Sequence, residues 1–399
     1  MVFVNNLGGA PGVPEWTQHL PARTDGYTVA DMVLPWFLFL VGASLPPSLG
    51  RHLAPGPQGS PWRAARRILP RVAGLLLLGL IFVNHGRLDP AATGLSADLW
   101  LVLAVAAAVL FLRRTAQPPS RRDRMGKVVA GLALAVLLVL YRGEAGDGAS
   151  TWLRPGWWGI LGIIGWAYGV GAIIYLLSRG HPVGLMGALG LLTAVAIGTE
   201  EGRYGWLTFL SWLFGVHEFL GSFTAIVVAG ALAGRLVFVP DSRPLRNLVL
   251  LGAGLWLAGW FLRPLHGYHK LGATESWALV AAGQGALMLA LAHLLADRPG
   301  RRRPPGDEPP MARSRDPEPG FERPGRTGPL VWLGEAGRSA LLAYLLSEWL
   351  HPASRLVGLD LTPLYDRGGA WAMANAALVA VAVLAMAALA ARRRFEVKL

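Results

Sequence analysis

The chain has 399 residues, of which 53% are hydrophobic, and a formal net charge of +13. So apolar a composition excludes an ordinary soluble two-domain protein and is typical of a polytopic membrane protein. The chain contains no cysteine, which excludes disulfides and thiolate catalysis. Its positive charges stand in short clusters beside apolar runs, without a nucleic-acid-binding motif. We therefore expect no nucleic-acid partner and attribute the charge to membrane topology and anionic lipids.

Apolar runs long enough, or nearly long enough, to cross a bilayer recur along almost the whole chain. A hydrocarbon core of roughly 30 Å requires about 20 apolar residues in a helix. We therefore predict an all-α fold, a polytopic transmembrane helical bundle with about eleven full spans, at residues 28–50, 68–85, 97–112, 128–141, 157–178, 182–198, 206–234, 246–263, 276–296, 329–349 and 369–391.

The first residues, MVFVNN, form a short apolar segment that turns polar before the first complete span. No basic segment precedes them, so they do not have the form of a signal peptide. We interpret them as the outer end of a truncated first helix and expect its inner half upstream of Met1 in the natural protein.

Titratable side chains are concentrated directly before the first complete span, in VPEWTQHLPARTDGYTVAD at residues 13–31. Thr28 to Asp31 has the form of a capping box, and the helix dipole favours an acid there, which explains Asp31 without a function. A cap does not explain the nearby His19, whose alternative interpretation is a solvated loop histidine. An acid well inside a span costs about 2.5 to 3.5 kcal/mol, so an acid beside a histidine at a helix mouth indicates a polar cavity.

The same stretch resembles the first conserved block of the heparan-alpha-glucosaminide N-acetyltransferase family and its bacterial relatives. A helix ends in FVNN, an outer loop brings a histidine, and the next helix opens with DGYTVADMVLPWFLF. The resemblance implies a multi-helix membrane enzyme that transfers an acetyl group from cytosolic acetyl-CoA to an amino sugar across the membrane. It also implies that His19 is catalytic, with Asn5 and Asp31 beside it.

Two later segments are similar to further blocks of that family. LRPLHGYHKLGATES places Lys270 at a lysine position, and the helix WLGEAGRSALLAYLLSEWL ends near an acid, Glu348. The resemblance implies that Lys270 and Glu348 belong to the substrate-binding site. The Gly-Val-Leu-Gln-Arg block usual at the fourth helix has no counterpart in residues 94–110.

The residues fit acyl transfer on chemical grounds as well. The acceptor must lose a proton as it attacks the thioester, and histidine is the side chain suited to accept a proton near neutral pH. His19 would act as this base or carry the acyl group as an acyl-imidazole. Asp31 would fix the tautomer of His19, and the Asn5 amide would donate to the developing oxyanion.

Other polar groups stand at predicted outer helix ends. FVNHGR echoes FVNN, so Asn84 and His85 are further candidates for substrate binding, with solvation at the interface as the alternative. His217 and Glu218 could bind sugar hydroxyls; the alternative is that they are ordinary polar residues of a loop. Trp157 and its neighbours are explained most simply as an aromatic belt at the membrane interface. No pair of histidines has metal-ligand spacing, so we expect no metal.

The basic residues predict the topology and the organisation of the chain. With these eleven spans, 27 of the 37 Lys and Arg residues fall in one set of alternate loops and 9 in the other. Cytoplasmic loops carry the excess of Lys and Arg. We therefore expect a protein of the inner cell membrane with the His19 loop on the outer side and the C-terminus in the cytoplasm. Residues 1–296 would form the transmembrane core, with the truncated helix and nine spans. Residues 297–328 would form a disordered basic cytoplasmic loop. Residues 329–399 would form the last two transmembrane helices and a basic cytoplasmic tail.

The sequence therefore predicts a transmembrane acyltransferase with acetyl-CoA as donor and no metal. The expected partners are acyl-CoA, an amino sugar or glycan acceptor, and membrane lipids, with assembly as a homodimer left open. The alternative is a multi-helix transporter of a small polar or sugar-like solute. Such transporters usually contain an internal repeat, of which this chain has only the short FVN echo.

Overall fold

The computed structural model describes residues 1–22, 24–53, 60–113, 119–144, 149–210, 213, 215–239, 243–296, 334, 337, 339–361, 363–393, 395 and 397. These residues are mostly helical, and the strands among them, β1 (Gly143–Glu144) and β2 (Ser150–Thr151), make one short antiparallel pair. The prediction of an all-α fold is confirmed in this form.

The long helices follow one another along the chain with short connections. They are α2 (Val29–Ala43), α4 (Pro61–His85), α6 (Ala97–Leu112), α7 (Arg121–Leu140), α8 (Gly159–Leu177), α9 (Pro182–Glu200), α10 (Phe223–Phe238), α11 (Pro244–His266), α12 (Glu275–Ala296), α14 (Ala340–Leu356) and α16 (Gly369–Arg392). Shorter helices are α1 (Val2–Leu7), α3 (Leu45–Leu49), α5 (Pro90–Thr93) and α15 (Pro363–Asp366), with single turns at η1 (Glu15–Thr17), η2 (Gly50–His52), η3 (Gly205–Leu210) and η4 (Glu218–Ser222).

Eight helical segments in the described part of the chain are long and apolar enough to cross a membrane, as expected of a multi-pass membrane protein. They are Val29–Leu49, Trp62–His85, Gly159–Leu177, Pro182–Glu200, Glu218–Phe238, Pro244–His266, Glu275–Leu295 and Gly369–Arg392.

Three of the eleven predicted spans are not among these eight. Helix α6, where the span at 97–112 was predicted, has only 16 residues. Helix α7 (Arg121–Leu140), where the span at 128–141 was predicted, begins with a charged turn. The first part of the span predicted at 329–349 lies mostly outside the described residues, as does the loop predicted at 297–328. The count of eleven and the cytoplasmic disorder of that loop therefore stay predictions.

The span predicted at 206–234 begins later than expected. Residues 205–210 form the 3₁₀ turn η3, and the chain enters α10 through the π-helical turn η4. Gly221 inside this turn has non-helical dihedrals, φ −134° and ψ −114°. The hydrophobic pattern of the sequence does not reveal such a break, which places Glu218 at the head of the span.

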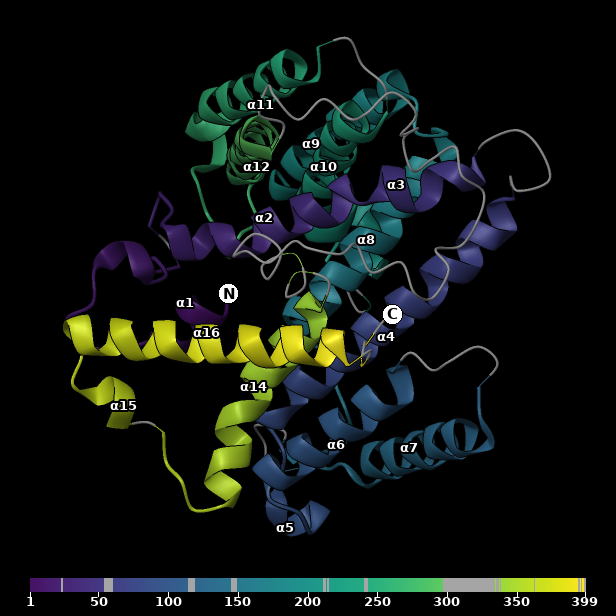
Figure 1. Ribbon diagram of the computed structural model, residues 1–399. Helices are drawn as coiled ribbons and strands as arrows, with labels where there is room; N and C mark the ends of the chain where they lie inside the picture. Colours follow the sequence, from purple (N-terminus) through teal and green to yellow (C-terminus); the bar gives the residue numbers. More distant parts are fainter. Residues whose placement is uncertain are drawn as a thin grey trace.

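Helix pairs form the bundle: α11 packs against α12, α10 against α2, α4 against α8 and α6 against α7. In Figure 1, α9 to α12 lie on one side of α2, while α6, α7 and α14 lie below it, with α16 crossing in front. The α2–α10 contact depends on glycines, because a Cβ at Gly42 or Gly230 would collide with the facing backbone. Close approach at small residues is a normal basis of helix packing in membranes.

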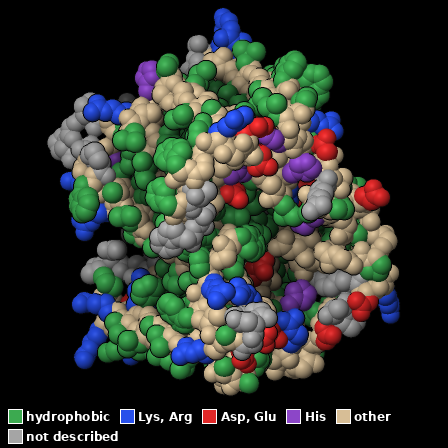
Figure 2. Space-filling model, turned by 180° about the vertical axis from the view of Figure 1, so that it is seen from behind, with side chains coloured by type: hydrophobic (Ala, Val, Ile, Leu, Met, Phe, Trp, Pro, Cys, Tyr) green, Lys and Arg blue, Asp and Glu red, His purple; other side chains and the backbone are tan. Residues whose placement is uncertain are grey.

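The surface combines bare apolar helix faces with an uneven distribution of charge. Large hydrophobic side chains of α7, α9 and α11 are exposed, as lipid-facing residues of a bundle are. In Figure 2 the left edge carries Lys and Arg and the acidic side chains stand mainly in the centre and on the right, with further Lys and Arg among them. The right edge of Figure 2 is the left of Figure 1, where α2 and α16 begin.

Candidate functional site

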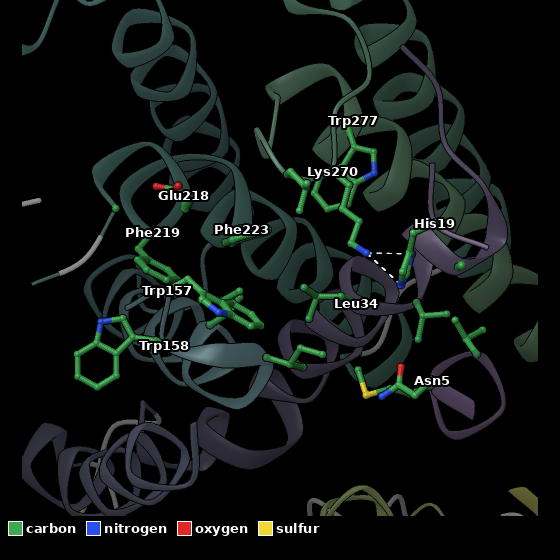
Figure 3. Close-up of a pocket in the computed structure, with 18 of the residues that line it drawn as sticks. Asn5, His19, Leu34, Trp157, Trp158, Glu218, Phe219, Phe223, Lys270 and Trp277 are labelled. Carbon is green, nitrogen blue, oxygen red and sulfur yellow. Dashed lines mark hydrogen bonds between the residues drawn. The ribbon is translucent and has the colours of Figure 1, made fainter. Parts of the chain in front are cut away.

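A cavity of about 600 Å³ lies between the start of α2, α1, α8, η4 and the loop that joins α11 to α12. Its polar side chains are Asn5, His19, Glu218 and Lys270, and the rest of its wall is mainly aromatic and aliphatic (Figure 3). A volume of this size is in the usual range for small-molecule sites. The cavity therefore unites four of the polar residues singled out from the sequence: His19, Asn5, Lys270 and Glu218.

Asp31 connects the first turn of α2 to His19. Its Oδ1 lies 2.9 Å from His19 Nδ1, while its Oδ2 accepts from the backbone N–H of Thr28 at 3.1 Å and of Leu20 at 3.4 Å. The side chain of Thr28 completes the capping box by accepting from the N–H of Asp31. Asp31 thus has both roles weighed from the sequence, because one oxygen caps the helix and the other faces the histidine.

The contact with Asp31 determines which nitrogen of His19 is available. A carboxylate accepts, so the hydrogen of a neutral imidazole resides on Nδ1 and leaves Nε2 as the basic nitrogen. Half of the His19 side chain is exposed, whereas the Asp31 side chain is 3% exposed. A buried carboxylate thus orients an accessible imidazole.

Lys270 approaches the same imidazole from the α11–α12 loop. Its Nζ lies 3.3 Å from His19 Nε2, 2.9 Å from Nδ1 and 3.5 Å from Asp31 Oδ1 (Figure 3). With the hydrogen on Nδ1, the ammonium donates to Nε2 or to the carboxylate. Burial lowers the pKa of Lys270 below its ordinary value, and Asp31 opposes that shift.

The α11–α12 loop is bound to the His19 loop by backbone contacts around Asp25. Tyr268 donates its N–H to Asp25 at 2.7 Å, a bond that lowers the pKa of this carboxyl. Gly26 donates to the carbonyl of Tyr268 at 3.1 Å, and Arg263 pairs with Asp25 at 3.1 Å. These contacts hold Lys270 against His19 although the two residues are far apart in the sequence.

Asn5 lines the cavity, but its amide is directed to another partner. Asn5 Nδ2 donates to Glu348 at 3.0 Å, on α14. Glu348 is not among the residues that line the cavity. It therefore lies behind Asn5 and orients its amide.

Asn84 and His85 are not brought to the cavity. Asn84 is buried, donates to the carbonyls of Leu80 and Arg154, and accepts from the N–H of Arg154. His85 lies 3.3 Å from Asp98, which Arg355 also binds at 2.6 and 2.8 Å. Both side chains are thus engaged in contacts between helix ends.

The two residues of the GVHEF segment are separated by the structure. His217 is buried, with its nitrogens 3.0 Å from the carbonyl oxygens of Ala196 and Ala273. Glu218 lines the cavity. The aromatic wall was not expected from the sequence, although Trp157 and Trp158 stand at the start of a predicted span and Trp277 just inside another. The aromatic residues of the wall are Trp157, Trp158, Phe219, Phe223 and Trp277.

A second cavity, of about 690 Å³, lies on the other side of α1. Met1 lines both cavities, and the second one extends past Phe37 of α2 and Tyr344 of α14 to Arg71 of α4. Arg71 lies in the basic N-terminal half of α4, whereas His85 ends this helix. In the described part of the chain, no group of three or more His, Asp or Glu side chains is arranged to hold a metal ion.

Comparison with known proteins yields one partial match. No protein-family model matches the chain. Over 84 residues the chain is 38% identical to human heparan-alpha-glucosaminide N-acetyltransferase, a match that covers 21% of this chain and 12% of the length of the human protein. This similarity supports a distant relationship to that family.

Proposed function

We propose that this protein is a transmembrane acyltransferase that moves an acetyl or other acyl group from cytoplasmic acyl-CoA to an amino sugar or another acceptor on the outer side of the membrane. The observation that carries the proposal is the group of His19, Asp31 and Lys270, in which His19 and Lys270 line the cavity and Asp31 pairs with His19. A structural role does not require an accessible imidazole there. The distant relationship to a membrane acetyltransferase supports the same class of reaction.

In the proposed reaction, the Lys270 ammonium donates to Asp31 and leaves His19 Nε2 available. The acceptor nitrogen or oxygen attacks the carbonyl carbon of the thioester while His19 Nε2 takes its proton. The carbon–sulfur bond then breaks, and the proton passes from His19 to the departing thiolate of CoA. Asp31 holds the tautomer, and the Lys270 ammonium and the Asn5 amide stabilise the negative oxygen of the intermediate. The same Nε2 could accept the acyl group first, which would give two transfer steps instead of one.

The donor would reach His19 through the second cavity. The pantetheine arm is thin enough for a passage between helices, and Arg71 with the basic inner loops would hold the phosphates. This route needs the orientation expected from the basic residues, with the His19 loop outside and 297–328 inside. An Arg313→Cys variant, in a chain without other cysteines, should be protected from an impermeant maleimide in intact cells.

The test uses purified protein in proteoliposomes with labelled acetyl-CoA. We expect free CoA and a labelled product to form together, and faster when amino sugars are present. If no acyl-CoA is consumed with any acceptor, the proposal is wrong.

The transporter remains the second candidate because the two cavities share Met1 and would also suit a solute pathway. It predicts uptake of a sugar-like solute into the same vesicles without consumption of acyl-CoA. Uptake without CoA release would therefore replace the acyltransferase by the transporter.

A further inference from the structure

Glu218 lies at the opposite end of the cavity from His19. Figure 3 shows Glu218 on one side and the pair of His19 and Lys270 on the other, with Phe223 between them. Among the described residues, no hydrogen bond or ion pair reaches the Glu218 carboxylate, whereas the groups at the other end bond to one another. A carboxylate that faces an aromatic cavity without a donor is costly unless water or a ligand satisfies it.

The backbone around Glu218 is specialised to hold this carboxylate at the cavity. Glu218 begins the π-helical turn η4, which contains the non-helical Gly221. A Cβ at residue 215 would collide with the Glu218 carboxylate, so Gly215 lets the side chain lie against the backbone. Single π-helical turns are rare and often occur at functional sites.

The facing wall is also built on an unusual backbone. Gly156, Trp158 and Gly159 have φ values of +52°, +66° and +62°, a conformation that a bulky residue such as tryptophan rarely adopts. The Trp158 indole donates to the carbonyl of Leu213 at 2.7 Å, which ties this turn to the segment before Glu218. The turn leaves Trp157 on the cavity with 60% of its surface exposed. Backbone strain of this kind concentrates at binding and active sites.

Aromatic rings connect the two ends of the cavity. Phe219 and Phe223 lie 6.0 Å apart between ring centroids, and Phe223 and Trp277 lie 6.3 Å apart. A ligand that reaches both ends must therefore have an apolar face between two polar groups. An exposed indole opposite a carboxylate suits a ring that carries an ammonium or hydroxyl group.

We propose that Glu218 and Trp157 form the acceptor subsite, which binds a hydrogen-bond-donating group on the acceptor, remote from the atom that is acylated. This inference rests on the proposed acyltransferase function. The acceptor is then a two-ended molecule: its nucleophile meets His19, its ring packs on Trp157, and its second polar group donates to Glu218. Glu218 selects the acceptor and takes no part in the chemical step.

The test compares three amines as acceptors: 4-cyclohexylcyclohexylamine, 4-(4-aminocyclohexyl)cyclohexanol and 4,4′-diaminobicyclohexyl. The last two add a hydroxyl or an ammonium group at the far end of the same two-ring skeleton, which is long enough to extend past one ring of the aromatic wall. The wild-type protein should prefer one or both over 4-cyclohexylcyclohexylamine, and which of the two it prefers identifies the donor group. In Glu218→Gln the KM for the preferred acceptor should rise roughly tenfold to a hundredfold, because the loss of a hydrogen bond to a charged group weakens binding by about this factor. Its kcat and the KM for acetyl-CoA should stay within about threefold, since the chemical step does not use Glu218.

Controls separate this inference from a folding defect and from the proposed function. Glu144→Gln removes an exposed carboxylate outside the cavity and should behave as wild type. Glu218→Asp keeps the charge at a shorter reach and should give an intermediate KM, so the inference stays testable if the glutamine variant does not fold. Wild-type transfer with an unchanged acceptor KM in both Glu218 variants overturns the subsite and leaves the function standing. Absence of transfer to any acceptor overturns both.

Discussion

The protein contains two clusters in which a histidine, an aspartate and a basic side chain meet, and they differ in how the base is attached. At one, Lys270 reaches His19 and Asp31 with single contacts of 2.9 to 3.5 Å. At the other, Arg355 donates two hydrogen bonds of 2.6 and 2.8 Å to Asp98, and His85 lies 3.3 Å from the same carboxylate.

The difference shows that residue types alone do not identify a reactive site. A bidentate arginine uses the carboxylate oxygens and fixes two helix ends to each other. A lysine is a point charge on a flexible stem, so it can leave Nε2 to a ligand while Asp31 keeps the imidazole oriented. His19 and Lys270 of the first cluster also line the cavity at α2, whereas His85, Asp98 and Arg355 do not. We therefore place the proposed chemistry at His19 and propose a structural role for His85.

The largest expected effect is the loss of the histidine at the first cluster. His19→Ala should lower the rate of acyl transfer by about 10²- to 10⁴-fold, the usual contribution of a general base. His85→Ala is the matched control and should keep kcat/KM within about twofold. Steady-state rates measured on monodisperse protein test both variants. Equal losses of kcat/KM in the two would contradict a difference in function between His19 and His85.

The two aspartates give the next effect. Asp31→Asn should lower kcat about tenfold or more, because an amide no longer fixes the tautomer of His19. It should also lower the free energy of unfolding by about 1 kcal/mol through the weakened cap. Asp98→Asn should lower the melting temperature and leave kcat unchanged. A loss of stability without a loss of kcat in Asp31→Asn would reduce Asp31 to a helix cap.

Substitution of the two asparagines of the FVN segments, Asn5 and Asn84, should also affect different properties, activity in one case and stability in the other. Asn84→Ala removes a buried amide and leaves the N–H and carbonyl of Arg154 without their partner, so the free energy of unfolding should fall by about 1 to 3 kcal/mol. Asn5→Ala should lower kcat severalfold with little change in stability, since Asn5 is exposed at the cavity. Thermal unfolding and turnover, measured on both variants, would show the reverse pattern if Asn5 were structural.

The smallest effect is a pH dependence of stability that Lys270 contributes. Its pKa is lowered in the folded protein, so the unfolded chain holds a proton that the folded one has lost between that lowered pKa and the ordinary value of 10.5. The lysine therefore makes the folded protein gain stability as pH rises through this window. The melting temperature of wild type minus that of Lys270→Met should increase with pH in this window. A flat difference would contradict the burial of the ammonium.

The sequence predicts local features of the site better than distant ones. The capping box at Thr28 and the nearness of His19 to Asp31 follow from a short segment, because caps and the following turn are local. The burial of Asn84 could not be predicted, since it depends on Arg154, 70 residues away. FVNN and FVNH therefore look alike in the sequence although only one lines the cavity. The position of Glu348 behind Asn5 depends on a contact between residues that are even further apart, 343 positions in the sequence.

Most of the other site features that the sequence did not predict depend on irregular backbone. Glu218 reaches the cavity through a π-helical turn, and Trp157 through a turn with positive φ at Trp158. Hydrophobic periodicity assumes regular helices, so it assigns the first to the interior of a span and the second to an interfacial belt. The spans were predicted more successfully, because bilayer thickness alone sets their length.

The most direct test of the account is a structure of the protein with a non-hydrolysable thioether analogue of acetyl-CoA. We expect the acyl group within contact distance of His19 Nε2 and the pantetheine arm in the second cavity, past Met1 toward Arg71. An analogue bound beside His85 and Asp98, or with its acyl end away from both cavities, would contradict the assignment of the reaction to His19.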